Sequence, residues 1–341
     1  TGNAADVKTV LKADGITLDK AATGAVAVTV TGTVSAADAN TIAKATDGKV
    51  TATVAAGTAA SLKAALTDVT TGLDALKLKV TGTATVADLL ALDGKTSIPV
   101  DAKSVTAITG TAAEFATLNT ANVDYSSTVA FTFTDTIAAA DVNAANGLNA
   151  LAAQTFGKVT ATVEDSAANL AANLATASTD AITVKVTGTT ATAAQLLAID
   201  KVTSVVVDAK AVKTITADAA DVADVTTVLA AKTIAKAADV AVTIDAADDI
   251  TAIQANSIAK LTTGVVTATV AAGSASYLNT TLKDAKATDA LKLTVTGEAT
   301  AADLKALDAK TSEVVTATGI TLITGNAADV KTVLKADGIT L

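Results

Sequence analysis

The 341-residue sequence contains no cysteine, histidine, methionine or tryptophan, and no arginine, so that all 25 basic residues are lysine. Proline occurs once and aromatic residues make up 2% of the chain. Without histidine and cysteine, the chain cannot form the usual nucleophile–base triads, thiolate nucleophiles or Cys/His zinc sites. Its isolated glycines form no GxGxxG or GxxxxGK[ST] phosphate-binding motif. We therefore predict that the protein is not an enzyme and binds no cofactor.

Charge and hydropathy exclude two further classes of partner. The formal net charge is −9, whereas nucleic-acid surfaces need clustered basic residues and aromatic rings that stack on bases. The sequence has no run of 18 apolar residues, which a membrane-spanning helix would require. The expected partners therefore include no nucleic acid, and no membrane span is predicted.

What the chain does contain is repetition at two levels. The segment TGNAADVKTVLKADGITL occurs at Thr1–Leu18 and again, without a single change, at Thr324–Leu341. The segment VTATV begins at Val50, Val159 and Val266. The period between the identical ends, about 323 residues, thus contains three super-repeats of about 107 residues. We assign residues 1–24 to the end of a preceding repeat and 25–127, 128–239 and 240–341 to super-repeats 1, 2 and 3 of one continuous structure.

Each super-repeat divides into four units of about 27 residues in which a strand alternates with a helix. Apolar and polar residues alternate in the strands, as in Leu76-Lys-Leu-Lys-Val80, which indicates a sheet covered on one face only. Helices between successive strands require parallel pairing. The fold expected is an α/β class, parallel one-sided β/α solenoid resembling leucine-rich-repeat architecture, uncapped at both ends. In super-repeat 1 the predicted strands are Val26–Val30, Val50–Val54, Leu76–Val80 and Ile98–Asp101.

Hydroxyl residues followed three positions later by a carboxylate mark the predicted helix starts, which resemble capping boxes. They are Ser35, Thr85, Thr111 and Thr300, followed by Asp38, Asp88, Glu114 and Asp303. Glycines at 32, 82, 188 and 297 are expected to end the strands, where the chain turns. The predicted core of super-repeat 1 consists of Val26, Val28, Val30, Val50, Val54, Leu76, Leu78, Val80, Leu89 and Leu92.

Calcium is the one ion that the composition leaves open, because it prefers carboxylate and carbonyl oxygens. Weak candidates in predicted turns are Asp47, Asp93, Asp101, Asp208, Asp245, Asp248 and Asp249. No EF-hand loop and no GGxGxDxUx repeat supports them, and Asp-Gly is also favourable turn chemistry. Structural calcium is thus an open alternative to a chain without metal. A regular threonine grid for ice binding is not expected, because Lys77, Lys79 and Pro99 interrupt it.

The segments VTGTATVADLLALDGKTS at residues 80–97 and VTAITGTAAEF at residues 105–115 carry a family resemblance. They resemble the Thr/Ala/Asp-rich tandem-repeat regions of giant bacterial, cyanobacterial-type, cell-surface proteins. The resemblance implies an extracellular or cell-surface location and a structural or adhesive role. It favours a fibre, stalk or surface-layer segment that associates with itself by end-to-end continuation and possible lateral packing. The alternative is an adhesin module that recognises polysaccharide or another cell surface.

Overall fold

A computed structural model of the chain describes residues 1–12, 25–69, 72–143, 147–247 and 249–341. The chain forms two compact regions. The first comprises residues Thr1–Val163 and Ala175–Ile182, and the second comprises Glu164–Leu174 and Thr183–Leu341. These two regions do not coincide with the three super-repeats that the sequence periods define.

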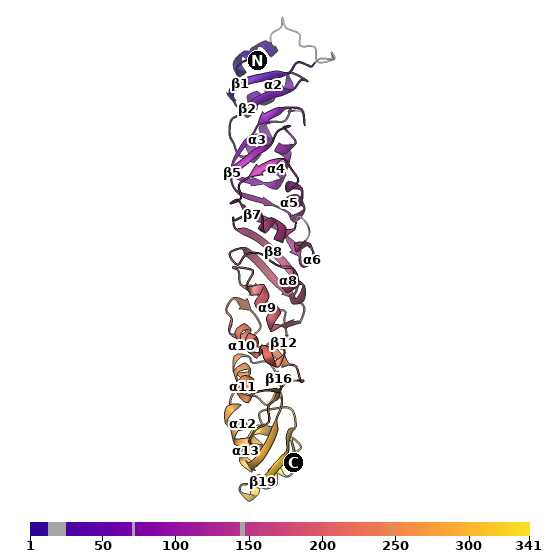
Figure 1. Cartoon of the computed structure of the whole chain (residues 1–341), viewed down its shortest axis with the longest axis vertical. Coiled ribbons are helices and arrows are strands. Elements are labelled where there is room, and N and C mark those ends of the chain that lie inside the picture. Colours follow the sequence, from indigo (N-terminus) through magenta and orange to yellow (C-terminus); the bar gives the residue numbers. More distant parts are fainter. Residues whose placement is uncertain (13–24, 70–71, 144–146, 248) are drawn as a thin grey trace. The chain divides into compact units, whose positions relative to one another are not determined.

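Strands and helices alternate along the first region (Figure 1). Its elements are α1 (Ala4–Lys12), β1 (Val28–Val34), α2 (Ala36–Lys44), β2 (Val50–Val54), α3 (Ala59–Ala65), β3 (Ala75–Lys77), β4 (Lys79–Thr85), α4 (Val86–Asp93), β5 (Val100–Gly110), α5 (Ala112–Leu118), β6 (Val123–Tyr125), β7 (Ala130–Ala138), α6 (Ala139–Val142), α7 (Leu148–Ala152) and β8 (Val159–Ser166), whose last residues belong to the second region.

The second region continues the same alternation with shorter strands. Its elements are α8 (Ala167–Asn173), β9 (Ala181–Thr187, whose first residues belong to the first region), β10 (Thr190–Thr192), α9 (Ala193–Asp200), β11 (Val207–Asp208), β12 (Thr214–Ala217), the 3-10 helix η1 (Ala219–Asp221), α10 (Val222–Ala230), β13 (Ile234–Ala235), β14 (Ala241–Ile244), β15 (Asp249–Ile250), α11 (Ala252–Leu261), β16 (Val266–Val270), α12 (Ala275–Thr281), β17 (Ala290–Lys292), β18 (Thr294–Thr300), α13 (Ala301–Asp308), β19 (Val315–Thr324), α14 (Ala327–Val333) and β20 (Ile339–Thr340).

Every strand pair whose register the structure describes is parallel, which confirms an α/β fold with parallel strands. In the first region β1 pairs with β2 and β2 with β3, while β5 pairs with β4, β6 and β7. In the second region β10 pairs with β12, β12 with β14, β14 with β16 and β16 with β17. Separately, β19 pairs with both β18 and β20. Partners in these orders are about one repeat unit apart in sequence, because each crossover holds one helix or loop.

The alternation of strand and helix has exceptions that the sequence analysis did not predict. The predicted strand Leu76–Val80 is two strands, because β3 pairs with β2 whereas β4 pairs with β5. Leu78 lies between them and is 1% exposed. Its inward-facing side chain preserves the period-two pattern, so the pattern could not reveal the change of partner. The fourth predicted strand, Ile98–Asp101, begins later and is longer, since β5 spans Val100–Gly110.

Three of the turn glycines lie inside strands rather than at their ends. Gly32, Gly82 and Gly297 lie in β1, β4 and β18, with φ of 76°, 81° and 80°. This left-handed backbone strongly favours glycine, and it coincides with register shifts in the parallel pairs. The expectation that these strands end at glycine was therefore wrong. Gly188, which follows β9, does mark a strand end.

The predicted core of super-repeat 1 is confirmed at every position except one. Val50, Leu76 and Leu89 are fully buried, and the other inward residues are at most 7% exposed. Val26 is 45% exposed and lies before β1, which begins at Val28. In β2 the burial alternates, so that the valines and Ala52 are buried and Thr51 and Thr53 face outward.

Aromatic side chains gather at one place in the first region. Phe115 of α5 contacts Phe131 and Phe133 of β7, with ring centroids 5.1 and 4.5 Å apart. Tyr125 of β6 packs edge-on against Phe131 at 5.8 Å. Elsewhere the core consists of small aliphatic contacts between successive units, as the composition predicts.

Candidate functional site: polar contacts between successive units

Three buried aspartates join the second and third units of the super-repeats. Asp74, Asp180 and Asp289 are 1%, 4% and 0% exposed. In each, carboxylate oxygen Oδ1 accepts the backbone N–H of a valine that begins the preceding unit's strand, at 2.7 to 3.0 Å. In Asp180 and Asp289, Oδ2 also accepts the N–H three residues earlier, at 2.9 and 2.8 Å. Each carboxylate thus satisfies backbone groups that would otherwise be buried without partners.

Buried threonines join the first and second units in the same manner. Thr46, Thr155 and Thr262 donate their hydroxyl hydrogen to a carbonyl of the preceding unit, at 2.8, 2.6 and 2.6 Å. The same hydroxyl oxygen accepts the N–H of the glycine two residues on. A Cβ at Gly48 or Gly157 would lie 2.2 Å from the preceding unit's carbonyl oxygen. The Thr-x-Gly sequence is therefore a corner at which two successive units touch through their backbones.

A third set of corners joins the third and fourth units through Thr96 and Thr311, which are 5% and 6% exposed. Each hydroxyl donates to the carbonyl of the leucine in the preceding strand, at 2.9 and 2.7 Å, and accepts the N–H of the same leucine at 3.0 Å. Among the side-chain nitrogen and oxygen atoms that the structure describes, none is buried without a hydrogen-bond partner. The buried aspartates and threonines of these three sets therefore use their polar groups to hold one unit to the next.

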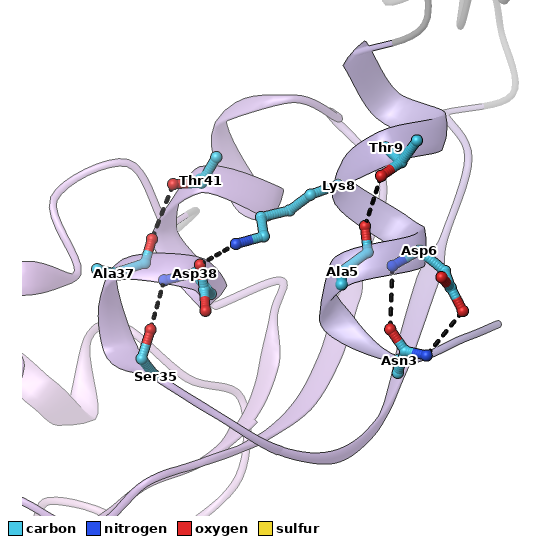
Figure 2. A network of polar contacts seen from close by, with 9 residues as sticks. All are labelled: Asn3, Ala5, Asp6, Lys8, Thr9, Ser35, Ala37, Asp38 and Thr41. Atoms are coloured by element: carbon cyan, nitrogen blue, oxygen red, sulfur yellow. Dashed lines mark hydrogen bonds and ion pairs between the residues drawn. The ribbon is translucent and has the colours of Figure 1, made fainter.

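Charged side chains form a second series of contacts on the helices. A lysine five residues after one N-cap reaches the aspartate three residues after the next N-cap. This pattern joins Lys8 to Asp38, Lys63 to Asp88 at 2.7 Å and Lys305 to Asp329 at 2.9 Å. Figure 2 shows Lys8 of α1 extended toward Asp38 at the start of α2. The contacts recur at equivalent positions, so they fix the register of one helix on the next.

These contacts explain both the pKa shifts and the outcome of the predicted capping boxes. Hydrogen bonds from Lys8 and Ser35 lower the pKa of Asp38, and Lys63 likewise lowers that of Asp88. The predicted N-caps are confirmed, since each hydroxyl accepts the backbone N–H of its third helical residue. Of the four predicted capping boxes, only the one at Thr111 is complete, because the side chain of Glu114 accepts the backbone N–H of Thr111 in return. The shorter aspartates do not reach back, and Asp38 and Asp88 instead bind lysines of the preceding helices.

The calcium candidates lie at separate places in the fold. Asp101, Asp208 and Asp245 each use Oδ1 to accept the N–H two residues on, at 3.1, 3.2 and 3.0 Å, which stabilises a turn. Asp47 is the exposed middle residue of a Thr-x-Gly corner, and Asp93 ends α4. Asp249 is exposed in β15, and Asp248 lies outside the described residues. Within the described ranges, no three carboxylates come close enough to hold a metal ion.

An open groove in the second region has a volume of about 520 Å³. A threonine ladder crosses its floor, because Thr192, Thr216 and Thr243 lie in register on β10, β12 and β14 and continue to Thr267 on β16. Asp218, Asp221 and Asp245 contribute carboxylates to its wall, which has no basic residue. The arrangement offers hydroxyl and carboxylate groups for hydrogen bonding and has no aromatic platform.

The inter-unit contacts were not predicted from the sequence. From the sequence, Asp47-Gly48 is interpreted as a turn and Asp47 as a calcium candidate. The residues that form the contact between units are Thr46 and Gly48, on either side of Asp47. The available signal was the recurrence of Thr-x-Gly at residues 46, 155 and 262, at the super-repeat spacing. No helix among the described residues is both long and apolar enough to cross a membrane. No protein-family model, curated protein or solved structure matches the chain.

Proposed function

We propose that the chain is a non-catalytic structural segment of a long extracellular or cell-surface fibre, stalk or surface layer. In this proposal its repeat units stack as an uncapped, one-sided β/α solenoid, in the manner of the giant bacterial surface proteins that the sequence resembles. The observation that carries the proposal is the recurrence of buried polar contacts between units at the super-repeat spacing, three times for the Thr46 and Asp74 positions and twice for the Thr96 position. A fold whose buried polar groups serve to join neighbours is suited to supplying length.

Parallel pairing and burial support the same proposal. Within each sheet, strands such as β1, β2 and β3 pair with the strand of the next unit, and inward residues are buried while threonine and lysine face outward. A stack of this kind protects its interior strand edges by continuing, and end-to-end contact with a further copy would extend it. The net charge of −9 would keep such assemblies apart in solution and allow lateral packing when salt screens it.

The experiment that tests this proposal is a substitution inside one unit. Leu78→Asp would bury an unpaired charge at a site that is 1% exposed. In a stack coupled through nearest neighbours, we expect hydrogen exchange to accelerate in the units around β3 and β4 and to remain slow in the second region. The matched control is Lys77→Asp on the exposed side of the same strand. Simultaneous loss of protection in both regions would contradict the proposal.

The groove supports an adhesin as the second candidate function. Hydroxyls spaced by strand separation, roughly 4.8 Å apart, and three carboxylates could hydrogen-bond an extended polysaccharide. Glycan-array binding by the intact chain, lost on replacing Thr216 and Thr243 by valine and retained on replacing Thr51 and Thr53, would favour this candidate. If no glycan binds, or if the two double variants behave alike, the adhesin proposal fails at this groove.

A further inference from the structure

The first twelve residues of the sequence that occurs twice, Thr1–Lys12 and Thr324–Lys335, share their helix cap and an internal threonine bond. Asn3 caps α1 and accepts the N–H of Asp6 at 3.0 Å, and Asn326 caps α14 and accepts that of Asp329 at 2.9 Å. Thr9 and its counterpart Thr332 each donate a hydroxyl hydrogen to the carbonyl four residues earlier, at 2.9 Å. Figure 2 shows this cap and this threonine bond in α1. The two helices share their cap and their first two turns, whereas α1 continues to Lys12 and α14 ends at Val333, two residues earlier at equivalent positions.

The surroundings of the two helices cover different parts of one apolar side of the helix, because Val7, Val10 and Leu11 are three and four residues apart. In α1, which packs on the following helix α2, Val7 is 9% exposed and Val10 is 47% exposed. In α14, which packs on the preceding helix α13, the counterpart of Val10 is Val333, and it is 1% exposed. Leu334 is 61% exposed, whereas its counterpart Leu11 is partly covered. Together the two environments bury the positions of both Val7 and Val10, whereas each alone leaves one of them incompletely covered.

From this complementarity we infer that the exposed side of α14 binds the face of α2 and β1 in a second copy of this chain once that copy's own α1 is displaced. The inference rests on the proposed function and specifies its partner at the level of residues. The template is the contact that α1 already makes with α2 and β1 within one chain. Because residues 324–335 are identical to residues 1–12, they carry the same side chains that α1 places on that face.

Two polar contacts define the register of this interface. Lys8 pairs with Asp38 in the chain, so its exposed counterpart Lys331 pairs with Asp38 of the second copy. The backbone of Gly2 bridges to β1, donating its N–H to the carbonyl of Thr29 at 3.2 Å and accepting the N–H of Thr31 at 2.9 Å. Gly325 takes the place of Gly2. The same bridge recurs within the chain at Gly57 and Gly273, so it is a regular contact between successive units.

The second copy's own α1 competes for this face. It carries the same residues and is tethered, and a tether of this kind gives an effective concentration of about 1 mM. At micromolar concentration the intact chain should therefore remain a monomer. A substitution that displaces α1 and leaves α14 unchanged should open the face of α2 and β1. Helix α14 of another chain could then bind there.

The test uses the full-length chain with Val7→Asp, which places a charge at the buried residue of α1, a helix that packs on α2 and β1. Head-to-tail binding generates open linear assemblies. We expect the mean mass by light scattering to rise at least twofold between about 1 and 100 µM, whereas the original chain stays monomeric. The matched control is Val7→Asp combined with Val330→Asp, the equivalent change in α14, which should restore the monomer.

A charge exchange tests the register and guards against misfolding of the first unit. Adding Asp38→Lys to the Val7→Asp chain should abolish assembly, and adding Lys331→Asp to that variant should restore it. The free peptide TGNAADVKTVLKADGITL should shorten the assemblies by occupying the open face. A Val7→Asp chain that is monomeric at the highest of these concentrations, with circular dichroism and hydrogen exchange unchanged beyond β2, overturns the inference. Assembly that survives Val330→Asp or Asp38→Lys overturns it as well.

The outcomes separate this inference from the proposed function. If the Val7→Asp chain stays monomeric while Leu78→Asp loosens only neighbouring units, the docking fails and the stacked structural segment stands. If Leu78→Asp unfolds both regions together, the proposed function fails whatever the mass of the Val7→Asp chain.

Discussion

Replacing Asp289 by alanine removes a carboxylate that holds two successive units together. Asp289 is fully buried, and its two oxygens accept the N–H groups of Val266 at 3.0 Å and Lys286 at 2.8 Å. Alanine would leave both donors without an acceptor in the interior. Each unsatisfied buried group costs about 1–3 kcal/mol, so the variant should lose roughly 2–5 kcal/mol of local stability.

Hydrogen exchange followed by mass spectrometry measures this loss unit by unit. In peptides covering β16 and β17, protection should fall roughly 30- to 3,000-fold, since every 1.4 kcal/mol is a factor of ten. Peptides covering β1 and β2 should be unchanged, because units couple mainly to their neighbours. Asp337→Ala, at an exposed position, is the control and should alter neither. Unchanged protection at β16, or equal loss throughout the chain, would refute the role assigned to the buried carboxylate.

Three further predictions concern the other inter-unit contacts. Gly264→Ala would place a Cβ 2.4 Å from a carbonyl oxygen of the preceding unit. It should lower the free energy of unfolding, measured by thermal unfolding, by about 1–3 kcal/mol. The control Gly94→Ala, whose Cβ would have its nearest contact at 3.6 Å, should be tolerated. Thr46→Val should destabilise by about 1–3 kcal/mol because two buried backbone groups lose their partner, and Thr46→Ser should restore most of the loss; equal stability of the two variants would contradict this. The hydrogen bond from Lys8 lowers the pKa of Asp38 in the folded chain. The stabilisation that this bond gives is therefore present above about pH 4 and is lost as the pH falls through the folded pKa. In Lys8→Ala, carboxyl NMR titration should show that the pKa of Asp38 rises toward its ordinary value.

The general character of the fold was predictable because the core pattern is simple. Alternation in Val50–Val54 correctly identified β2, and the Ser/Thr-x-x-Asp/Glu pattern correctly identified the N-caps at Ser35 and Thr111. Both signals act within a few residues of sequence, where side-chain direction and capping geometry dominate.

What the sequence did not reveal depends on contacts between units. Leu78 is buried in either strand arrangement, so its hydropathy did not indicate that β3 and β4 pair with different neighbours. Asp289 was not distinguished from exposed aspartates, because its burial follows from an N–H group located 23 residues earlier. Val26 matched the apolar pattern, yet β1 begins two residues later and leaves it exposed. Such long-range partners are not encoded in the local period.

Small-angle X-ray scattering of the intact chain tests the proposed solenoid most directly. A compact domain of 341 residues would have a radius of gyration of about 20 Å. A solenoid of successive units should give a value far above this, with a distance distribution typical of a rod of constant cross-section. A radius of gyration equal to that of the compact domain, with a symmetric distance distribution, would contradict the structural role proposed for this chain.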